Sequence, residues 1–359
     1  MLNLGQLVNA VQKNCHISDA RHAGDFTLCI FLLKMREFYR WEHDIPFASE
    51  LPKSEVGTWL QEREGLWSDL ESSAFEPLPL ETGHLDPFDA ETVNRELIHR
   101  GYVYSGGYGR FSKPHFFLGT LLKKEQRDGH TIYISSCEYA RDLEAPPAML
   151  QGKTIYIRQE SVRRFVWEKI EEWRWNRKNE AMERALACYA FEIDMNSALE
   201  RMTENETEAM ILHELGEGRA GEKLGAEWQK MLATFSRSKA EIMVRAVRDI
   251  LADCLSTLPG LLSSNNFASL HFYFANFTGM RKHLFPEAME AYRRWATTDD
   301  LQPLQALVES GQRRWLETAR TIMSLYREHG DQAAIEKLLE PAADSEPPIC
   351  VPPKAASRS

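Results

Sequence analysis

The sequence predicts a mainly α-helical fold, a helix bundle with a small antiparallel β insertion. From residue 161 to residue 339, apolar side chains recur at helical spacing almost without a break. Between residues 102 and 140, by contrast, short runs of β-branched and aromatic residues alternate with turn residues. We therefore expect one large helical domain over residues 1–340, with the β insertion at about residues 102–140. The proline-rich residues 341–359 predict a disordered tail.

Before the β insertion, the chain is expected to form several helices. Their apolar residues follow helical spacing, and prolines or cap residues separate them. Asp89 is expected to cap the last of these helices, because its side-chain oxygen can accept a free backbone N–H. The expected helices cover residues 2–12, 19–41, 54–72 and 89–100.

Three short apolar runs predict the β insertion, at residues 102–104, 116–122 and 131–135. A glycine cluster at residues 106–109 separates the first two runs. We interpret this cluster as a hairpin turn, because a phosphate loop would continue into Gly-Lys-Ser/Thr and a helix. The helices expected later in the chain cover residues 161–202 with one break, 203–221, 238–258, 266–282, 286–295, 304–328 and 332–339.

Composition and charge restrict the partners. The 359 residues carry a formal net charge of −10, which disfavours nucleic acid or an anionic membrane surface as the main partner. No apolar run reaches the roughly 18–20 residues that a membrane helix needs, and no signal peptide is evident. Six scattered cysteines without a Cys-x-x-Cys pair favour reduced thiols. We expect a cytoplasmic protein with no nucleic-acid or membrane partner, and a small molecule is one class of ligand that the sequence allows. The sequence leaves the oligomeric state open.

The second expected helix is apolar almost all the way round. At about 100° per residue, His22, Asp25, Arg36 and Arg40 fall within a stripe roughly 60° wide. Such a helix is usually buried, and buried charges are costly unless they are paired or coordinated. The stripe is therefore either an ion-pair network, in which Asp25 and Glu37 hold the arginines, or the wall of a polar site. In the second case the arginines would grip the carboxylate or phosphate of an anionic substrate.

A second candidate site lies in residues 211–218. His213 and Glu217 are four residues apart, so both leave one helical face and can bind one metal ion. The order resembles the zinc-protease pattern His-Glu-x-x-His, with Glu217 in place of the second histidine. A simple amphipathic helix would instead turn both side chains to solvent. Against this alternative stand Gly216 and Gly218, since each destabilises a helix interior by about 0.5–1 kcal/mol relative to alanine.

His271 lies in the aromatic helix expected over residues 266–282. It is either a hydrogen-bonded core residue or a third metal ligand, because helix bundles build metal sites from inward side chains on facing helices. A site with two histidines and one carboxylate suits iron with dioxygen, or zinc for hydrolysis. Iron, manganese and zinc are the metals that we consider.

Two functional hypotheses follow. In the first, the protein is a metal-dependent enzyme, oxidative or hydrolytic, acting on a small anionic substrate that Arg36 and Arg40 orient. Glu214 would be the general base for a metal-bound water. The expected metal ligands are His22, Asp25, His213, Glu217 and His271. In the second, a non-enzymatic scaffold or regulatory protein holds the same residues in ion pairs and offers an aromatic docking surface. That surface would consist of Trp167, Trp173 and Trp175.

The chain also resembles an uncharacterised bacterial protein family. The likeness rests on Asp-Ala-Arg-His-Ala-Gly-Asp at residues 19–25, Leu-Leu-Lys-Met-Arg-Glu-Phe-Tyr at residues 32–39, and the His213 segment. It extends over most of the chain apart from the tail. The resemblance implies a soluble bacterial protein and brings no reaction, ligand or site with it.

Overall fold

The structure, a computed structural model, describes residues 2–109, 112–235, 238–330 and 332–340. Contacts between residues divide the chain into two compact units. Unit 1 is Met1–Lys223 with Leu251–Asn276, and unit 2 is Leu224–Ile250 with Phe277–Ser359. The single helical domain expected over residues 1–340 stays a prediction. The expected tail, residues 341–359, lies outside the described residues.

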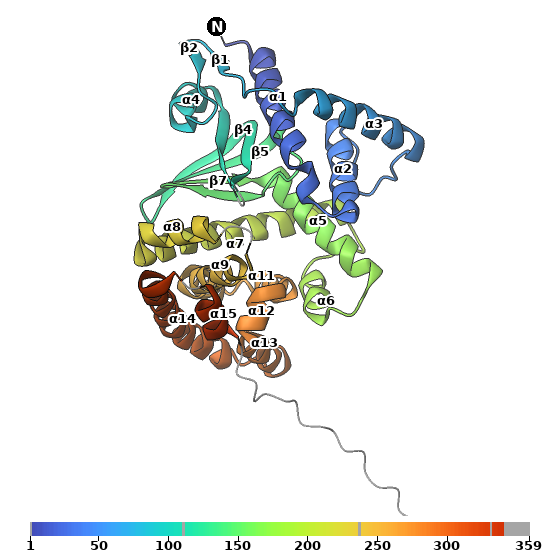
Figure 1. The fold of residues 1–359 in the computed structure, drawn as a ribbon. Coiled ribbons are helices and arrows are strands. Elements are labelled where there is room, and N and C mark those ends of the chain that lie inside the picture. Colours follow the sequence, from blue (N-terminus) through green and yellow to red (C-terminus); the bar gives the residue numbers. More distant parts are fainter. Residues whose placement is uncertain (1, 110–111, 236–237, 331, 341–359) are drawn as a thin grey trace, which may run out of the picture. The chain divides into compact units, whose positions relative to one another are not determined.

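Unit 1 combines helices with two β-sheets (Figure 1). Its helices are α1 (Leu4–His22), α2 (Leu28–Glu42), α3 (Lys53–Leu70), α4 (Ala90–Leu97), α5 (Gln159–Trp175), α6 (Glu180–Ala187), α7 (Met195–Leu224), α10 (Leu258–Ser263) and α11 (Phe267–Ala275). Its strands are β1 (Leu78–Leu80), β2 (Gly83–Leu85), β3 (Tyr102–Tyr108), β4 (Pro114–Arg127), β5 (His130–Arg141), β6 (Ala148–Gln151) and β7 (Thr154–Arg158). Short 3-10 turns cover Ala23–Asp25 and Ile98–Arg100, and a π-helical turn covers Asp253–Thr257.

The five-stranded sheet has the order β3-β4-β5-β7-β6 and is mixed. β3, β4 and β5 are antiparallel neighbours, but β7 pairs parallel to β5, with Ile132 opposite Ile155. The prediction of a mainly helical protein is confirmed. Three antiparallel strands lie where the β insertion was expected, but the sheet is mixed and continues to Arg158, so the expectation of a purely antiparallel insertion ending near residue 140 is wrong. A parallel neighbour needs a long connection, so turn signals between adjacent runs could not reveal β7. A small β1-β2 hairpin completes the strands of the described chain.

The helix α1 covers the sheet because its apolar residues recur every four positions. Leu7, Val11 and Cys15 are fully buried and belong to one core cluster with Tyr104 and Phe116 from β3 and β4. The Cys15 thiol donates a hydrogen bond to the Phe116 carbonyl, 3.2 Å away. Helix α5 contacts β5 and β7, and α4 contacts β3. The sheet is thus the platform against which the helices of unit 1 pack.

The continuous helix expected over residues 19–41 is interrupted. α1 ends at His22, a 3-10 turn follows, and α2 begins only at Leu28 after extended backbone at Thr27. Gly24, a poor helix former, lies within this interruption. The expected stripe is therefore broken, because His22 ends α1 and Asp25 lies in the interruption, whereas both arginines follow it on α2.

The first two turns of α2 are also not buried as expected. Leu28, Ile30, Leu32 and Leu33 are exposed, with Leu28 at 70%. Apolar character all round a helix predicts burial, but burial also requires a covering element. Within the described part of unit 1, the aromatic cluster contacts α2 only from Phe31 onward. That cluster joins Met35, Phe38 and Tyr39 to Trp59 and Trp67 of α3.

Unit 2, as far as it is described, is helical. Its helices are α8 (Ala226–Thr234), α9 (Lys239–Ala252, whose last two residues belong to unit 1), α12 (Gly279–Leu284), α13 (Pro286–Thr298), α14 (Gln302–His329) and α15 (Gln332–Leu339). α14 contacts both α13 and α15. Large aromatic side chains fill its interior: Trp228, Phe235, Trp295 and Trp315 are each at most 4% exposed. None of the described helices in either unit is long and apolar enough to span a bilayer.

Candidate functional site: an arginine-lined pocket in unit 1

His213 on α7 lies in an ion-pair cluster. Its Nδ1 is 2.8 Å from Asp253 Oδ1, and its Nε2 is 3.7 Å from Glu217 Oε1. Burial lowers the pKa of His213, but the Asp253 and Glu217 carboxylates outweigh this and raise the pKa well above its usual value. The two carboxylates therefore favour the imidazolium form, whereas a metal ligand needs a free nitrogen lone pair. This arrangement favours the ion-pair interpretation of His213 and Glu217.

Asp253 is the centre of this cluster and is 1% exposed. It also accepts hydrogen bonds from the Thr257 hydroxyl at 3.0 Å and the Tyr273 hydroxyl at 2.8 Å. The π-helical turn Asp253–Thr257 presents both Asp253 and Thr257 to this network. Single π-turns of this kind are frequent at functional sites. Here the turn joins α7 to α11 through hydrogen bonds.

Packing explains two glycines of α7, Gly216 and Gly218, but not Gly221. A Cβ at Gly216 would lie 2.4 Å from the Ala252 carbonyl oxygen, and one at Gly218 would lie 2.7 Å from the His130 ring. Both contacts are shorter than a real Cβ tolerates, so these positions require glycine. Close approach of other chain segments, rather than of a ligand, accounts for the two glycines.

The other residues of the expected metal site lie on α1, the 3-10 turn after it, α7 and α11. His22 Nδ1 is 3.1 Å from Asp25 Oδ2, and both residues are partly exposed at the end of α1. His271 is half-buried on α11, and Glu214 is buried on α7. Within the described ranges, no group of three or more His, Cys, Asp or Glu side chains is arranged to hold a metal ion. The assignments of His22, Asp25, His213, Glu217 and His271 as ligands, and of Glu214 as base, stay predictions.

Arg36 and Arg40 share one carboxylate. Arg36 Nε is 3.2 Å from Glu37 Oε1, and Arg40 Nε is 3.3 Å from Glu37 Oε2. The Arg36 side chain is 46% exposed, whereas that of Arg40 is buried, which lowers its pKa. Arg40 also donates hydrogen bonds to the carbonyls of Pro46 and Ser49 and so fixes the loop after α2. Arg40 is therefore ion-paired and also lines a pocket, and its role toward a substrate stays a prediction.

That pocket, which we call the arginine pocket, has a volume of about 330 Å³. α2, the loop after it, the end of β5, α5 and the start of α7 all contribute to it. Its lining combines guanidinium groups, carboxyl groups and an apolar surface. The residues are Arg40, Arg141, Arg163 and Arg164; Glu37, Asp44 and Glu160; and Trp41, Ile45, Pro46, Phe47 and Asn196.

Arg141 is the deepest cation of the arginine pocket. Its side chain is 1% exposed, and its Nε and Nη2 are buried without a hydrogen-bond partner in the described chain. The guanidinium carbon lies 4.9 Å from the Trp41 ring centre and 5.5 Å from that of Phe38. Burial, and then the Arg164 charge, lower the pKa of Arg141 to about 9, so it remains a cation at neutral pH. A buried cation whose N–H groups lack acceptors is costly.

Two further arginines come from α5. Arg164 donates hydrogen bonds to the Ala145 carbonyl at 2.9 Å and the Glu144 carbonyl at 3.3 Å. Arg163 lies 5.9 Å from the Phe47 ring centre, and its buried Nε has no hydrogen-bond partner among the residues described. Together with Arg40 and Arg141, these side chains place four guanidinium groups around one cavity.

Glu160 is the carboxyl group of the pocket whose pKa is strongly raised. Its Oε2 accepts a hydrogen bond from the Glu138 backbone N–H at 2.7 Å. Burial and the Glu138 carboxylate raise the pKa of Glu160 to about 7, although Arg141 and Arg158 oppose them. Glu160 therefore exchanges its proton near neutral pH.

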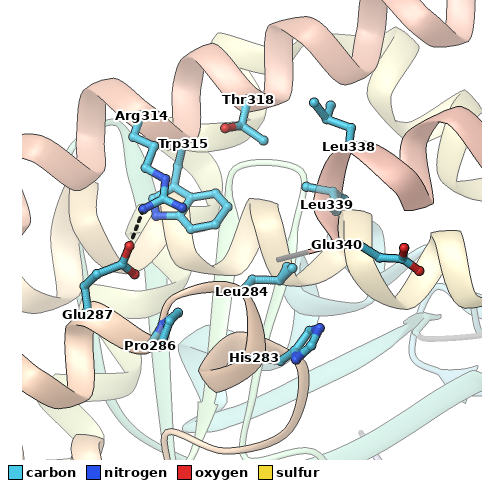
Figure 2. A pocket seen from close by; sticks show the side chains of 10 residues that line it. All are labelled: His283, Leu284, Pro286, Glu287, Arg314, Trp315, Thr318, Leu338, Leu339 and Glu340. Atoms are coloured by element: carbon cyan, nitrogen blue, oxygen red, sulfur yellow. Dashed lines mark hydrogen bonds and ion pairs between the residues drawn. The ribbon is translucent and has the colours of Figure 1, made fainter. Parts of the chain in front are cut away.

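Unit 2 holds a second pocket, of about 270 Å³, between α12, α13, α14 and α15 (Figure 2). Arg314 lies over the Trp315 ring at 5.1 Å and bonds to Glu287 at 2.8 Å. Its main cation is thus already paired. The arginine pocket is the better candidate because it contains a buried cation, Arg141, that lacks this compensation among the described residues.

The sequence indicates only part of the arginine pocket. Arg40 is a candidate from the sequence, but Arg163 and Arg164 lie in a segment where Glu160 and Glu168 alternate with them, a pattern that is typical of a solvated helix face. Nothing local marks Arg141, a single arginine at the end of a strand. The aromatic docking surface is reduced as well, because Trp167 is 4% exposed whereas Trp175 is 89% exposed.

Comparison with known proteins gives the family. Residues 6–158 match the model of the N-terminal domain of a family of unknown function (DUF6866), and residues 163–342 match that of its C-terminal domain. The chain belongs to DUF6866. No curated protein and no solved structure matches it. The resemblance to a family without an assigned function is confirmed, and the bacterial origin stays a prediction.

In this DUF6866 protein, the arginine pocket takes residues from both matched regions. Arg40 and Arg141 lie in the N-terminal match, Arg163 and Arg164 lie in the C-terminal match, and Glu160 lies between the two. All of them belong to unit 1. The boundary between the family domains therefore passes through the wall of a single cavity.

Proposed function

We propose that the protein binds a small organic anion, a carboxylate or a phosphate with an apolar body, in the arginine pocket. The observation that carries this proposal is Arg141, a buried guanidinium that lines the cavity with two N–H-bearing nitrogens lacking acceptors in the described residues. An oxyanion would supply those acceptors and neutralise the charge. Guanidinium groups fit carboxylate and phosphate oxygens in paired hydrogen bonds.

The apolar part of the lining argues for an organic ligand rather than an inorganic ion. Trp41 and Phe47 line the cavity next to the arginines and can pack against a ring or an aliphatic chain. The volume lies at the lower end of the range of about 300–1,000 Å³ for small-molecule sites. The ligand is therefore of the size of a substituted benzoate or a small sugar phosphate.

This proposal keeps the small anionic molecule of the first functional hypothesis, and it keeps Arg40 as a residue that faces it. It does not include a metal ion, because the described lining residues comprise neither histidine nor cysteine. Arg36 has no part in this proposal, since it lies outside the pocket lining and pairs with Glu37.

Isothermal titration calorimetry with the full chain tests the proposal. The probes are inorganic sulfate, inorganic phosphate, benzoate and benzenesulfonate. We expect the aromatic anions to bind more tightly than the inorganic ones. In Arg141→Met, the affinity should fall roughly tenfold or more, because a charge-assisted hydrogen bond contributes about 1.5–3 kcal/mol.

The matched control is Arg95→Met, which removes a guanidinium whose side chain is 69% exposed on α4. It should bind the probes as the unmodified protein does. Arg163→Met tests a second pocket cation at a half-buried position. Absence of heat for all four probes at about 10 mM would exclude even an affinity near 1 mM, about −4 kcal/mol, and would overturn the proposal.

A further inference from the structure

Glu160 lies at the start of α5 and faces the cation at the centre of the arginine pocket. Among the side chains that the structure describes, it makes no ion pair, and its hydrogen bond comes from a backbone N–H. Glu138, its neighbour on β5, is by contrast fully paired with other side chains. Glu138 accepts two hydrogen bonds from Arg158 and one from the Ser161 hydroxyl at 2.6 Å.

The charges around Glu160 come from three elements. β5 contributes Glu138 and Arg141, and β7 contributes Arg158. α5 itself contributes Arg163 and Arg164 to the same pocket. Further titratable groups nearby are the exposed Cys137 thiol, Asp44 in the loop after α2, and the ion-paired Glu37 and Arg40 of α2. Arg158 bonds to Glu138, whereas the positive charge of Arg141 acts on both Glu138 and Glu160 and bonds to neither of them among the described contacts.

We infer that Glu160 is the resident counter-ion of Arg141, and that an incoming oxyanion replaces it while Glu160 takes up one proton. This inference rests on the proposed anion-binding function. The balance is simple: a ligand anion, a proton and the Glu160 carboxylate give a bound anion beside a neutral Glu160 carboxyl group. No bond other than the O–H bond of Glu160 is formed.

Electrostatics makes this exchange favourable. Two carboxylates in one site repel each other, so one of them is protonated. Glu160 already has a pKa of about 7 because of burial and of Glu138, and proton uptake near neutral pH therefore costs little. A second negative charge in the pocket raises that pKa further. Proton uptake and anion binding are thus linked.

The exchange also restricts the chemical class of the ligand. A neutral carboxyl group donates a hydrogen bond through its O–H, which a carboxylate cannot do. The ligand then meets guanidinium N–H donors from the arginines and an O–H donor from Glu160. Oxyanions with several oxygens, such as carboxylates, sulfonates and phosphates, satisfy this donor set, whereas a halide ion cannot accept all of these bonds in their directions.

Calorimetry with benzenesulfonate tests the exchange, because the charge of this probe is constant over the pH range of interest. Titrations at pH 7 in two buffers of different ionisation enthalpy, neither containing an oxyanion, give the number of protons taken up. We expect an uptake between zero and one. Above pH 7 the affinity should weaken by up to about tenfold per pH unit.

Glu160→Gln, a variant of nearly the same shape, should bind the probe without proton uptake and with an affinity that is independent of pH. Glu172→Gln, which changes an exposed carboxyl on the same helix, should retain the uptake. If the unmodified protein binds benzenesulfonate without taking up a proton, the counter-ion role of Glu160 is overturned and the proposed function stands. If the probes do not bind at all, the proposed function itself fails.

Discussion

Arg158 holds the Glu138 carboxylate in a two-pronged ion pair, whereas Arg141, three residues after Glu138 and equally buried, lies against the Trp41 ring. The two arginines end neighbouring strands, β7 and β5. The same chemical group is thus satisfied at one strand end and lacks acceptors, within the described chain, at the other. This difference distinguishes Arg158, which is paired within the structure, from Arg141, for which we propose a role in ligand binding.

Replacing each arginine by methionine should show the difference as stability. Arg158→Met leaves a buried carboxylate without its partner, so the free energy of unfolding should fall by about 3–5 kcal/mol. Arg141→Met removes a costly cation together with a cation–π contact of similar size, so the change should stay within about 1 kcal/mol. Urea denaturation of the ligand-free variants measures both values. A similar large loss in both variants would mean that Arg141 is structural.

The His213 cluster should behave as an ion-pair network rather than as a metal centre. Chelation by EDTA should leave the thermal midpoint of the protein unchanged, because both imidazole nitrogens face carboxylates. His213→Gln removes the imidazolium that bonds to buried Asp253 and should lower the free energy of unfolding by about 1.5–3 kcal/mol.

The pH dependence of that loss has a defined sign. The folded-state pKa of His213 is raised, so its contribution is complete below the unfolded-state pKa near 6.5 and is lost as the pH rises toward the folded-state pKa. Metal analysis of the purified protein can contradict the ion-pair interpretation of the His213 cluster. Stoichiometric iron, manganese or zinc that disappears in His213→Ala and Glu217→Ala would support the metal-dependent enzyme instead.

Glu206 on α7 should make the protein less stable in alkaline solution. It is 4% exposed and accepts a hydrogen bond from the Ser269 hydroxyl at 2.7 Å. Burial raises the pKa of Glu206 to about 8 from an ordinary value of 4.5. Between these two values the unfolded chain binds fewer protons than the folded one, so stability falls as the pH rises. The slope is up to about 1.4 kcal/mol per pH unit.

Glu206→Gln keeps the shape of the side chain and cannot ionise, so it should flatten this slope and be the more stable protein at pH 8. The control is Glu204→Gln, at an exposed position of the same helix. Unfolding by urea at several pH values between 5 and 8.5 compares the three proteins. An unchanged slope in Glu206→Gln would show that Glu206 is ionised in the folded state.

Features that depend on residues close in the sequence could be predicted, whereas features that depend on distant residues could not. Local periodicity found most of the helices, because an amphipathic helix shows its pattern within one segment. It did not find the parallel pairing of β7 with β5, which depends on a partner more than 20 residues away in the sequence, as the Ile132–Ile155 pair illustrates. Arg141 was missed for the same reason, since the groups around it come from α2, β5 and α5.

The interruption between α1 and α2 shows a different limit. The apolar sequence of residues 28–41 does form most of a helix. Apolar residues alone, however, do not show which side of that helix another element covers. Phe38 meets Trp59 of α3 at a ring-centre distance of 6.0 Å, whereas Leu33 on the same helix is 58% exposed. The sequence-based interpretation treated these two residues alike, and the structure separates them.

Mutating both residues should therefore give different results. Phe38→Ala creates a cavity in the aromatic cluster of α2 and α3 and should lower the free energy of unfolding by about 3–5 kcal/mol. Leu33→Ser changes an exposed side chain and should alter it by less than about 0.5 kcal/mol. Urea denaturation at neutral pH measures both, and sedimentation of the unmodified protein and of Leu33→Ser at equal concentration shows whether self-association contributes. A loss of several kcal/mol in monomeric Leu33→Ser would place the first turns of α2 in the core after all, as the apolar pattern of the sequence suggests.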